Sequence, residues 1–212
     1  MNNERVRWLN QDPPALTNDE ESRLRAVIRR HCPEREAQFD LALNSGLRLS
    51  EQHGLLWKHV DWDRKLATIE LGKGSGRIEH VVLNSQALRA LSKLRARLGP
   101  GEAEAAEQPV CEGTAWDHRE WWDDVRREAG VKDFDWHDLR HTFASRLVMR
   151  DVNILAVQKL MRHATLSVTL RYAHLAPSHL HEAVEKLCAA ASVAASVTGV
   201  SDATQKPRQI LQ

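Results

Sequence analysis

The sequence lacks the marks of a membrane-spanning or exported protein. No apolar run within its 212 residues approaches the roughly 20 residues that cross a bilayer, and the N-terminus has no apolar signal core. The three cysteines, Cys32, Cys111 and Cys188, contain no C-x-x-C pair. An odd, unpaired set is typical of reduced thiols rather than of a disulfide framework. We therefore expect a cytoplasmic protein with no membrane partner.

An excess of charge is also missing. Lys and Arg total 30 against 29 Asp and Glu, so the composition gives no argument for a nucleic-acid partner. If the protein binds DNA, its basic residues must be segregated onto one face. Tyrosine is nearly absent as well, since the chain contains a single one, Tyr172. Chemistry that needs a tyrosine therefore has one candidate.

What the sequence does contain is helical periodicity interrupted by one short β segment. Thr17 and Glu20 form a capping-box pattern before an apolar stripe. Two aliphatic stretches, 66–71 and 78–83, flank G-K-G-S-G and predict a hairpin. The other expected helices cover about 35–44, 50–57, 88–98, 114–129, 137–149, 153–160 and the residues after Pro177. The predicted fold class is mainly α with a small antiparallel β-hairpin (α+β).

The expected organisation is one domain with a short segment at each end. Residues 1–16 are polar, contain two adjacent prolines, and are predicted to be a lead-in or linker. Residues 17–188 carry the apolar periodicity of the domain. Residues 189–212 turn to Ala, Ser, Val, Thr and then polar residues, which predicts a flexible C-terminal tail.

The stretch from Trp136 to His174 carries the most informative residues. It reads W-H-D-L-R-H-T-F-A-S and later L-M-R-H-A-T-L-S-V-T-L-R-Y-A-H. His137 and Arg140 are three residues apart and share one face of a helix. His163 then precedes Tyr172 by nine residues. H-x-x-R followed by H…Y resembles the tyrosine recombinase (phage integrase) family, and this resemblance implies covalent chemistry on a DNA phosphodiester.

Such chemistry needs a nucleophile that stays attached to the phosphate, and Tyr172 is the candidate. A free tyrosine has a pKa of about 10, so it needs positive charge nearby and a proton acceptor. Arginine suits the charge of the transition state, because its fork binds two oxygens and stays protonated. Arg48, in S-G-L-R-L-S-E, and Arg140 are the candidate phosphate-binding arginines.

Two further roles concern protons. The leaving oxygen of DNA needs a proton, and Lys73 at the tip of the predicted hairpin is the candidate general acid. His137 and His163 are predicted to handle the proton of Tyr172 and to bond the non-bridging oxygens.

These boxes, in this order and at these spacings, resemble the catalytic domain of the tyrosine recombinase (phage integrase) family over about residues 15–188. Arg48 with Glu51 looks like the first arginine box, where the acid orients the arginine, and Lys73 follows 25 residues later. Thr169 and His174 also sit as in the family. The positions that match the family's catalytic set are Arg48, Lys73, His137, Arg140, His163 and Tyr172, with Glu51 in support.

The resemblance implies the integrase catalytic-domain fold and site-specific strand exchange on double-stranded DNA through 3′-phosphotyrosyl linkages. It implies no metal and no nucleotide cofactor. It also implies a homo-tetramer on paired DNA sites with exchange of C-terminal segments, a monomer without DNA, and a bacterial or phage-encoded protein at the nucleoid. Relative to the family's pattern, the N-terminal core-binding domain is expected to be absent.

One departure concerns a site residue. Arg162 stands where the family usually has the glycine of L-G-H. A side chain there either crowds the site or adds a contact to DNA, so the predicted DNA-binding residues are Arg48, Lys73, Arg140 and Arg162.

Several alternatives stay open. A type IB topoisomerase would use similar chemistry without synapsis, and a non-catalytic DNA-binding protein could keep the fold. Arg48 could be a surface partner of Glu51, Lys73 a solvated lysine, and Tyr172 a core residue. His137 and His141, four residues apart, could bind zinc only with a third ligand, and no H-E-x-x-H pattern is present. G-K-G-S-G is followed by a predicted strand and lacks the K-[ST] end of a phosphate loop.

Overall fold

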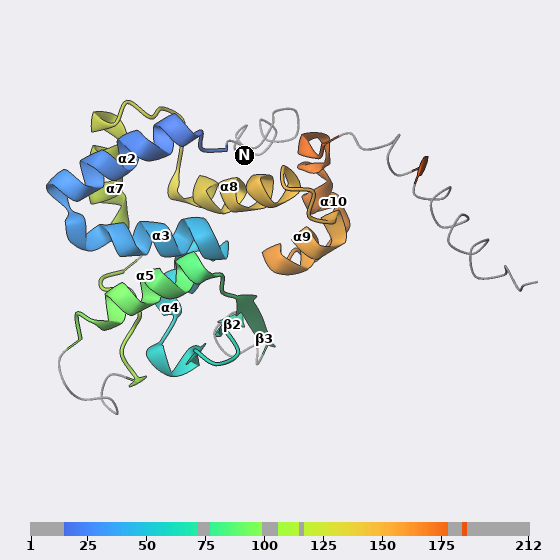
Figure 1. The fold of residues 1–212 in the computed structure, drawn as a ribbon. Helices are drawn as coiled ribbons and strands as arrows, with labels where there is room; N and C mark the ends of the chain where they lie inside the picture. The colour runs from blue at the N-terminus through green and yellow to red at the C-terminus, as the bar shows by residue number, and fades with distance from the viewer. Residues whose placement is uncertain (1–14, 72–76, 99–105, 115–116, 178–183, 186–212) are drawn as a thin grey trace, which may run out of the picture. The chain divides into compact units, whose positions relative to one another are not determined.

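The computed structural model describes residues 15–71, 77–98, 106–114, 117–177 and 184–185 (Figure 1). The chain divides into two units, Met1–Ala176 and Pro177–Gln212, and every element named here belongs to the first. The α-helices are α2 Asn18–His31, α3 Glu36–Ser45, α4 Leu49–Gly54, α5 Ser85–Arg95, α7 Asp117–Glu128, α8 Trp136–Val148, α9 Ile154–Met161 and α10 Leu166–Leu170. The strands are β1 Val60–Asp61, β2 Leu66–Leu71 and β3 Arg77–Val82, and the 3-10 turns are η1 Pro33–Arg35, η2 Trp57–His59 and η3 Ala173–Leu175.

Helix α3 is central because opposite faces of it are buried. Phe39, Ala42 and Leu43 belong to a core shared with α2, α7 and α8, while Ala37 and Leu41 belong to a second core shared with α5 and the sheet. A helix that is buried on opposite faces must lie between layers. Figure 1 shows α3 running between α8 and α5.

The helix beginnings follow the capping signals of the sequence. Thr17 caps α2, accepting the Glu20 N–H at 3.2 Å while the Glu20 carboxylate accepts the Thr17 N–H at 3.0 Å, as the capping-box pattern predicts. Asn84 caps α5 through its side-chain oxygen, which accepts from Gln86 and Ala87. At the other end of α3, Gly46 takes a left-handed φ of 62° and turns the chain into α4.

The β structure is a three-stranded antiparallel sheet in the order β1-β2-β3. The predicted hairpin is present, with Leu66 opposite Val82 and Ile69 opposite Glu79. The sequence predicted two strands, and β1 adds a third by pairing Val60 with Ala67. The G-K-G-S-G segment, and with it Lys73, lies outside the described residues.

Tyr172 lies in a third core formed where α9 and the Tyr172–η3 segment pack on α8. This core contains Ala144, Val148, Val157, Met161 and Tyr172. The helix predicted from about His137 is α8, and the shorter one predicted from Asn153 is α9. Helix α10 and η3, on either side of Tyr172, were not predicted. Most of the helix expected after Pro177 falls outside the described residues.

In the part of the chain that the structure describes, every helix is too short or too polar to span a bilayer.

Candidate active site

Arg48 is held at the start of α4 by the acid that follows it. Its N–H donates to Glu51 Oε2 at 2.9 Å, and its guanidinium donates to Glu51 Oε1. The Arg48 side chain is 37% exposed, while that of Glu51 is 6% exposed. The acid therefore lies beneath the arginine and leaves part of the guanidinium open to a ligand.

Glu51 remains a carboxylate in this position. Burial acts to raise its pKa, but the Arg48 N–H and the guanidinium groups of Arg162 and Arg48 outweigh burial and hold the pKa below its ordinary value. A charged acid with both oxygens engaged can orient an arginine, as the resemblance predicts.

Arg140, on α8, is buried and anchored by main-chain oxygens. Its Nη1 donates to the Gly46 carbonyl and its Nη2 to the Met161 carbonyl. Burial, followed by the charges of Arg48 and Arg162, lowers its pKa to about 9. The group is still protonated at neutral pH. Three guanidinium groups so close together form a positive site that an anion would stabilise.

Tyr172 has a buried ring and a hydroxyl that meets a histidine. The residue is 0% exposed, and its hydroxyl is hydrogen-bonded to Nδ1 of His141. Burial raises the pKa of Tyr172 to about 12, although Arg171 and Arg140 act to lower it. The hydroxyl therefore keeps its proton in the free protein and needs an acceptor before it can attack.

The neighbouring histidines are neutral. Burial, then the charges of His137 and Arg171, lowers the pKa of His141 to about 3. Burial, then Arg140 and Arg48, lowers that of His163 to about 4, and the same three causes lower that of His137. His163 Nδ1 lies 2.9 Å from Thr169 Oγ1. Neutral imidazoles can accept protons, and a bound phosphate would raise their pKa values.

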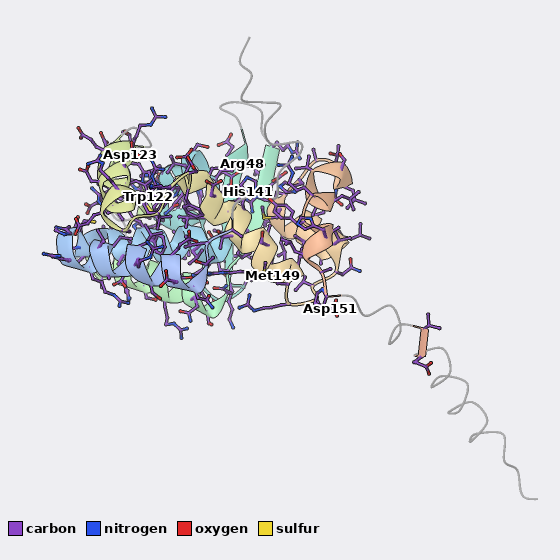
Figure 2. The ribbon with its side chains drawn as sticks, turned by 90° about the horizontal axis from the view of Figure 1, so that it is seen from above. Arg48, Trp122, Asp123, His141, Met149 and Asp151 are labelled. Carbon is purple, nitrogen blue, oxygen red and sulfur yellow. The ribbon has the colours of Figure 1, made fainter. Side chains whose placement is uncertain are left out.

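Five of the six predicted catalytic residues line one cleft of about 490 Å³. The sixth, Lys73, lies outside the described residues. In Figure 2, Arg48 and His141 lie in the same central region, away from Met149 and Asp151 at the far end of α8. The cleft is lined by Arg48, Asp135, His137, Asp138, Arg140, His141, His163, Val168, Arg171 and Tyr172.

His141 is the residue whose role the motif reasoning missed. The sequence paired it with His137 as a zinc alternative, and the two rings are in fact 5.0 Å apart. The partner of its Nδ1 is the tyrosine hydroxyl. No group of three or more His, Cys, Asp or Glu that could hold a metal occurs among the described residues. Spacing alone showed which helix face His141 occupies, not what would fold against it.

Arg162 points inward rather than toward a ligand. Its side chain is 3% exposed, and its Nη2 donates to Glu51 Oε2 at 2.6 Å. Its two Nη groups donate to Glu51 and to the Leu160 and Gly46 carbonyls, whereas its Nε has no hydrogen-bond partner among the described residues. The contact between Arg162 and DNA stays a prediction.

The chain is similar to known integrases and recombinases. The sequence profile of the phage integrase family matches residues 14–179. The integrase of Salmonella phage P22 is 32% identical over 192 residues, which cover 85% of this chain and 46% of that protein. Tyrosine recombinase XerC of Xylella fastidiosa is 38% identical over 146 residues, covering 66% of this chain and 48% of XerC.

The fold agrees as well. A solved structure of the Tn1549 transposon integrase, in complex with circular-intermediate DNA, superposes with a TM-score of 0.68 at 20% identity, covering 84% of this chain and 67% of that one. The mainly helical architecture with a small antiparallel sheet is that of a tyrosine recombinase catalytic domain. The chain belongs to the phage integrase family. It spans about half the length of the curated relatives it matches.

Proposed function

We propose that this chain carries the catalytic site of a site-specific DNA recombinase that cuts and rejoins double-stranded DNA through a 3′-phosphotyrosyl intermediate. The observation that carries the proposal is the shared cleft. Three arginines, three histidines and Tyr172 line this cleft, and they come from the start of α4, from α8 and from the α9–η3 segment. The complex of the Tn1549 integrase with DNA supports DNA as the substrate.

In the proposed cleavage step, the Tyr172 oxygen forms a bond to the scissile phosphorus and the bond to the 5′ oxygen breaks. His141 Nδ1 takes the tyrosine proton as the bond forms, since the hydroxyl is not ionised beforehand. The leaving 5′ oxygen takes a proton from Lys73, whose role rests on the resemblance. Arg48 and Arg140 bind the non-bridging oxygens, on which negative charge accumulates.

Rejoining reverses these steps with the 5′ hydroxyl of another strand. The bond energy is retained in the phosphotyrosyl linkage, so the scheme requires no nucleotide cofactor. Neither does it assign a step to a metal ion.

The experiment is a cleavage assay on supercoiled plasmid in EDTA, quenched with SDS. We expect relaxed DNA and a covalent protein–DNA adduct from the wild type, and neither from Tyr172→Phe, which keeps the ring and loses only the hydroxyl. A wild type that binds the plasmid but yields no adduct would contradict the proposal and favour a non-catalytic DNA-binding protein. Strand exchange between two marked duplexes separates a recombinase from a topoisomerase, which would relax the plasmid only.

We also propose that the protein acts on bacterial or phage DNA at the nucleoid, as a monomer that assembles into a tetramer on paired sites. Exchange of the segment after Pro177 would join the subunits. Sedimentation with and without site-bearing DNA tests the assembly, and intact synapsis after deletion of that segment would contradict the exchange.

A further inference from the structure

Arg162 occupies a backbone position that disfavours it. It ends α9 in the left-handed conformation, with φ 53° and ψ 42°. Glycine adopts this conformation without strain, and other residues hold it at a cost in free energy. The contacts of this buried, charged side chain must therefore offset the free-energy cost of the left-handed backbone.

Those contacts converge on the groups that hold the two phosphate-binding arginines. Arg162 Nη2 donates to Glu51 Oε2 at 2.6 Å and to the Gly46 carbonyl at 3.3 Å. Glu51 is the acid that holds Arg48, and the Gly46 carbonyl is an acceptor of Arg140. The buried Arg162 guanidinium thus binds both Glu51, which holds Arg48, and the Gly46 carbonyl, which holds Arg140.

The remaining contacts hold Arg162 itself in place. Its Nη1 donates to the Leu160 carbonyl at 3.1 Å, and its Nε lies 3.7 Å from Glu79 Oε2 on β3. Glu79 also pairs with Arg77 through its other oxygen at 2.7 Å. The Arg162 side chain therefore joins the end of α9 to the start of α4 and to the sheet.

We propose that Arg162 is a positioning residue for the phosphate-binding arginines, acting through Glu51 and the Gly46 carbonyl, and that it does not contact DNA. With Arg162 on Glu51 Oε2, Oε1 is left to face Arg48, so the Arg48 guanidinium keeps one orientation. Without Arg162, Glu51 Oε2 keeps only the Arg48 main-chain N–H. It can then also accept from the Arg48 guanidinium, whose orientation is no longer unique. The expected effect of Arg162 on the cleavage rate rests on the proposed function, whereas its expected effect on the order of the Arg48 side chain does not.

The test uses three variants of the full chain. Arg162→Gly removes the guanidinium and relieves the backbone, and Arg162→Lys keeps the charge but loses the fork. Asp151→Gly is the matched control, because Asp151 is an exposed residue with φ 60° that follows the end of α8, away from the cleft (Figure 2). It separates relief of the backbone from loss of the side chain.

The first readout needs no catalysis. The order parameter of the Arg48 Nε–Hε bond is measured by NMR relaxation, with the resonance assigned by its loss in Arg48→Lys. We expect an ordered bond in the wild type and in Asp151→Gly, a mobile one in Arg162→Gly, and an intermediate value in Arg162→Lys. An Arg48 side chain as ordered in Arg162→Gly as in the wild type would overturn the proposal. Should the glycine variant fail to fold, wild-type order in Arg162→Lys would do the same.

The second readout is the rate of adduct formation on supercoiled plasmid as a function of DNA concentration. Misplaced arginines should lower the maximum rate of Arg162→Gly by about 10- to 100-fold and leave the half-saturating DNA concentration within about 3-fold. An unchanged maximum rate with a raised half-saturating concentration would mean that Arg162 contacts DNA, and would overturn the proposal. If the wild type forms no adduct, the proposed function fails, while the NMR result still decides the role of Arg162.

Discussion

At the scale of single residues, the hydroxyl of Tyr172 meets a histidine that the motif spacing did not select. The sequence motifs predicted that His137 and His163 handle the tyrosine proton, whereas the hydrogen bond of the Tyr172 hydroxyl is to His141. His141 and Tyr172 are 31 residues apart, so their contact depends on how the chain returns to α8 at Tyr172 and η3. Periodicity can place a residue on a helix face, but it cannot say which distant segment covers that face.

Removing this acceptor should slow cleavage. We expect His141→Ala to lower the single-turnover rate of adduct formation by about 100-fold, because general bases contribute at least that much. His141→Gln can still accept a hydrogen bond but cannot take up the proton, so it should be nearly as slow. His31→Ala is the control, since His31 pairs with Glu128 on α7, away from the cleft. Wild-type rates in both His141 variants would exclude it as the base.

Gly46 is a second residue whose identity the site depends on. A Cβ at this position would lie 2.7 Å from Phe143 Cδ1, and its φ of 62° disfavours any side chain. We expect Gly46→Ala to lower the free energy of unfolding by about 1–3 kcal/mol and to slow cleavage, because the Gly46 carbonyl holds Arg140 and Arg162.

Gly54→Ala is the comparison, because nothing lies within 4 Å of a Cβ there. This variant should be as stable as the wild type or more stable by up to about 1 kcal/mol. Urea unfolding of both variants checks the difference, and equal midpoints would show that the α3–α4 turn tolerates a side chain.

At the scale of elements, the sequence predicted those that carry their own signal. The capping box of α2, the aliphatic strands and the apolar stripe of α8 all appear where expected. Strand β1 has only two residues, too few to show alternation, and it exists because it pairs with β2. Helix α10 has five residues, including the β-branched Val168 and Thr169, so local propensity does not favour it. Packing against α9 forms it instead.

Helix α7 contributes an unusual buried residue to its aromatic neighbourhood. His118 is 3% exposed, and its ring centroid lies 3.9 Å from that of Trp136 and 4.7 Å from that of Trp121. Neither ring nitrogen has a hydrogen-bond partner among the residues that the structure describes. Burial, then the charges of His53 and Arg35, lowers its pKa to about 3 from an ordinary value of 6.5.

This depressed pKa predicts a loss of stability in acid. Between about pH 6.5 and 3 the unfolded chain binds a proton that folded His118 does not, so the free energy of unfolding falls as the pH drops. The loss is at most about 1.4 kcal/mol per pH unit for one group. His118→Phe should raise stability at pH 7.5 and reduce the difference between pH 7.5 and pH 5 in urea unfolding. An equal difference in stability between pH 7.5 and pH 5 in the wild type and the variant would show that His118 does not cause the loss of stability in acid.

At the scale of the whole molecule, ion pairing determines where this nearly neutral chain carries positive charge. Away from the cleft, arginines are neutralised by neighbouring acids, as in Arg25 with Asp40 at 2.5 Å and Arg146 with Glu21 at 2.6 Å. In the cleft, Arg48 shares its carboxylate partner, Glu51, with Arg162, and Arg140 donates to main-chain carbonyls. Composition gave no sign of this arrangement, because a total of charges says nothing about which of them are paired.

This distribution predicts how the two kinds of arginine respond to salt. Each phosphate contact adds about 0.9 to the steepness with which the logarithm of the DNA-binding constant falls with the logarithm of salt concentration. Arg48 is partly exposed, so Arg48→Gln should reduce that slope by about 1. Arg162 is buried against Glu51, so Arg162→Gly should leave the slope unchanged although it slows cleavage. Fluorescence anisotropy of a labelled duplex from 50 to about 300 mM salt would measure both, and an equal reduction in the two variants would show that the buried guanidinium reaches DNA in the complex.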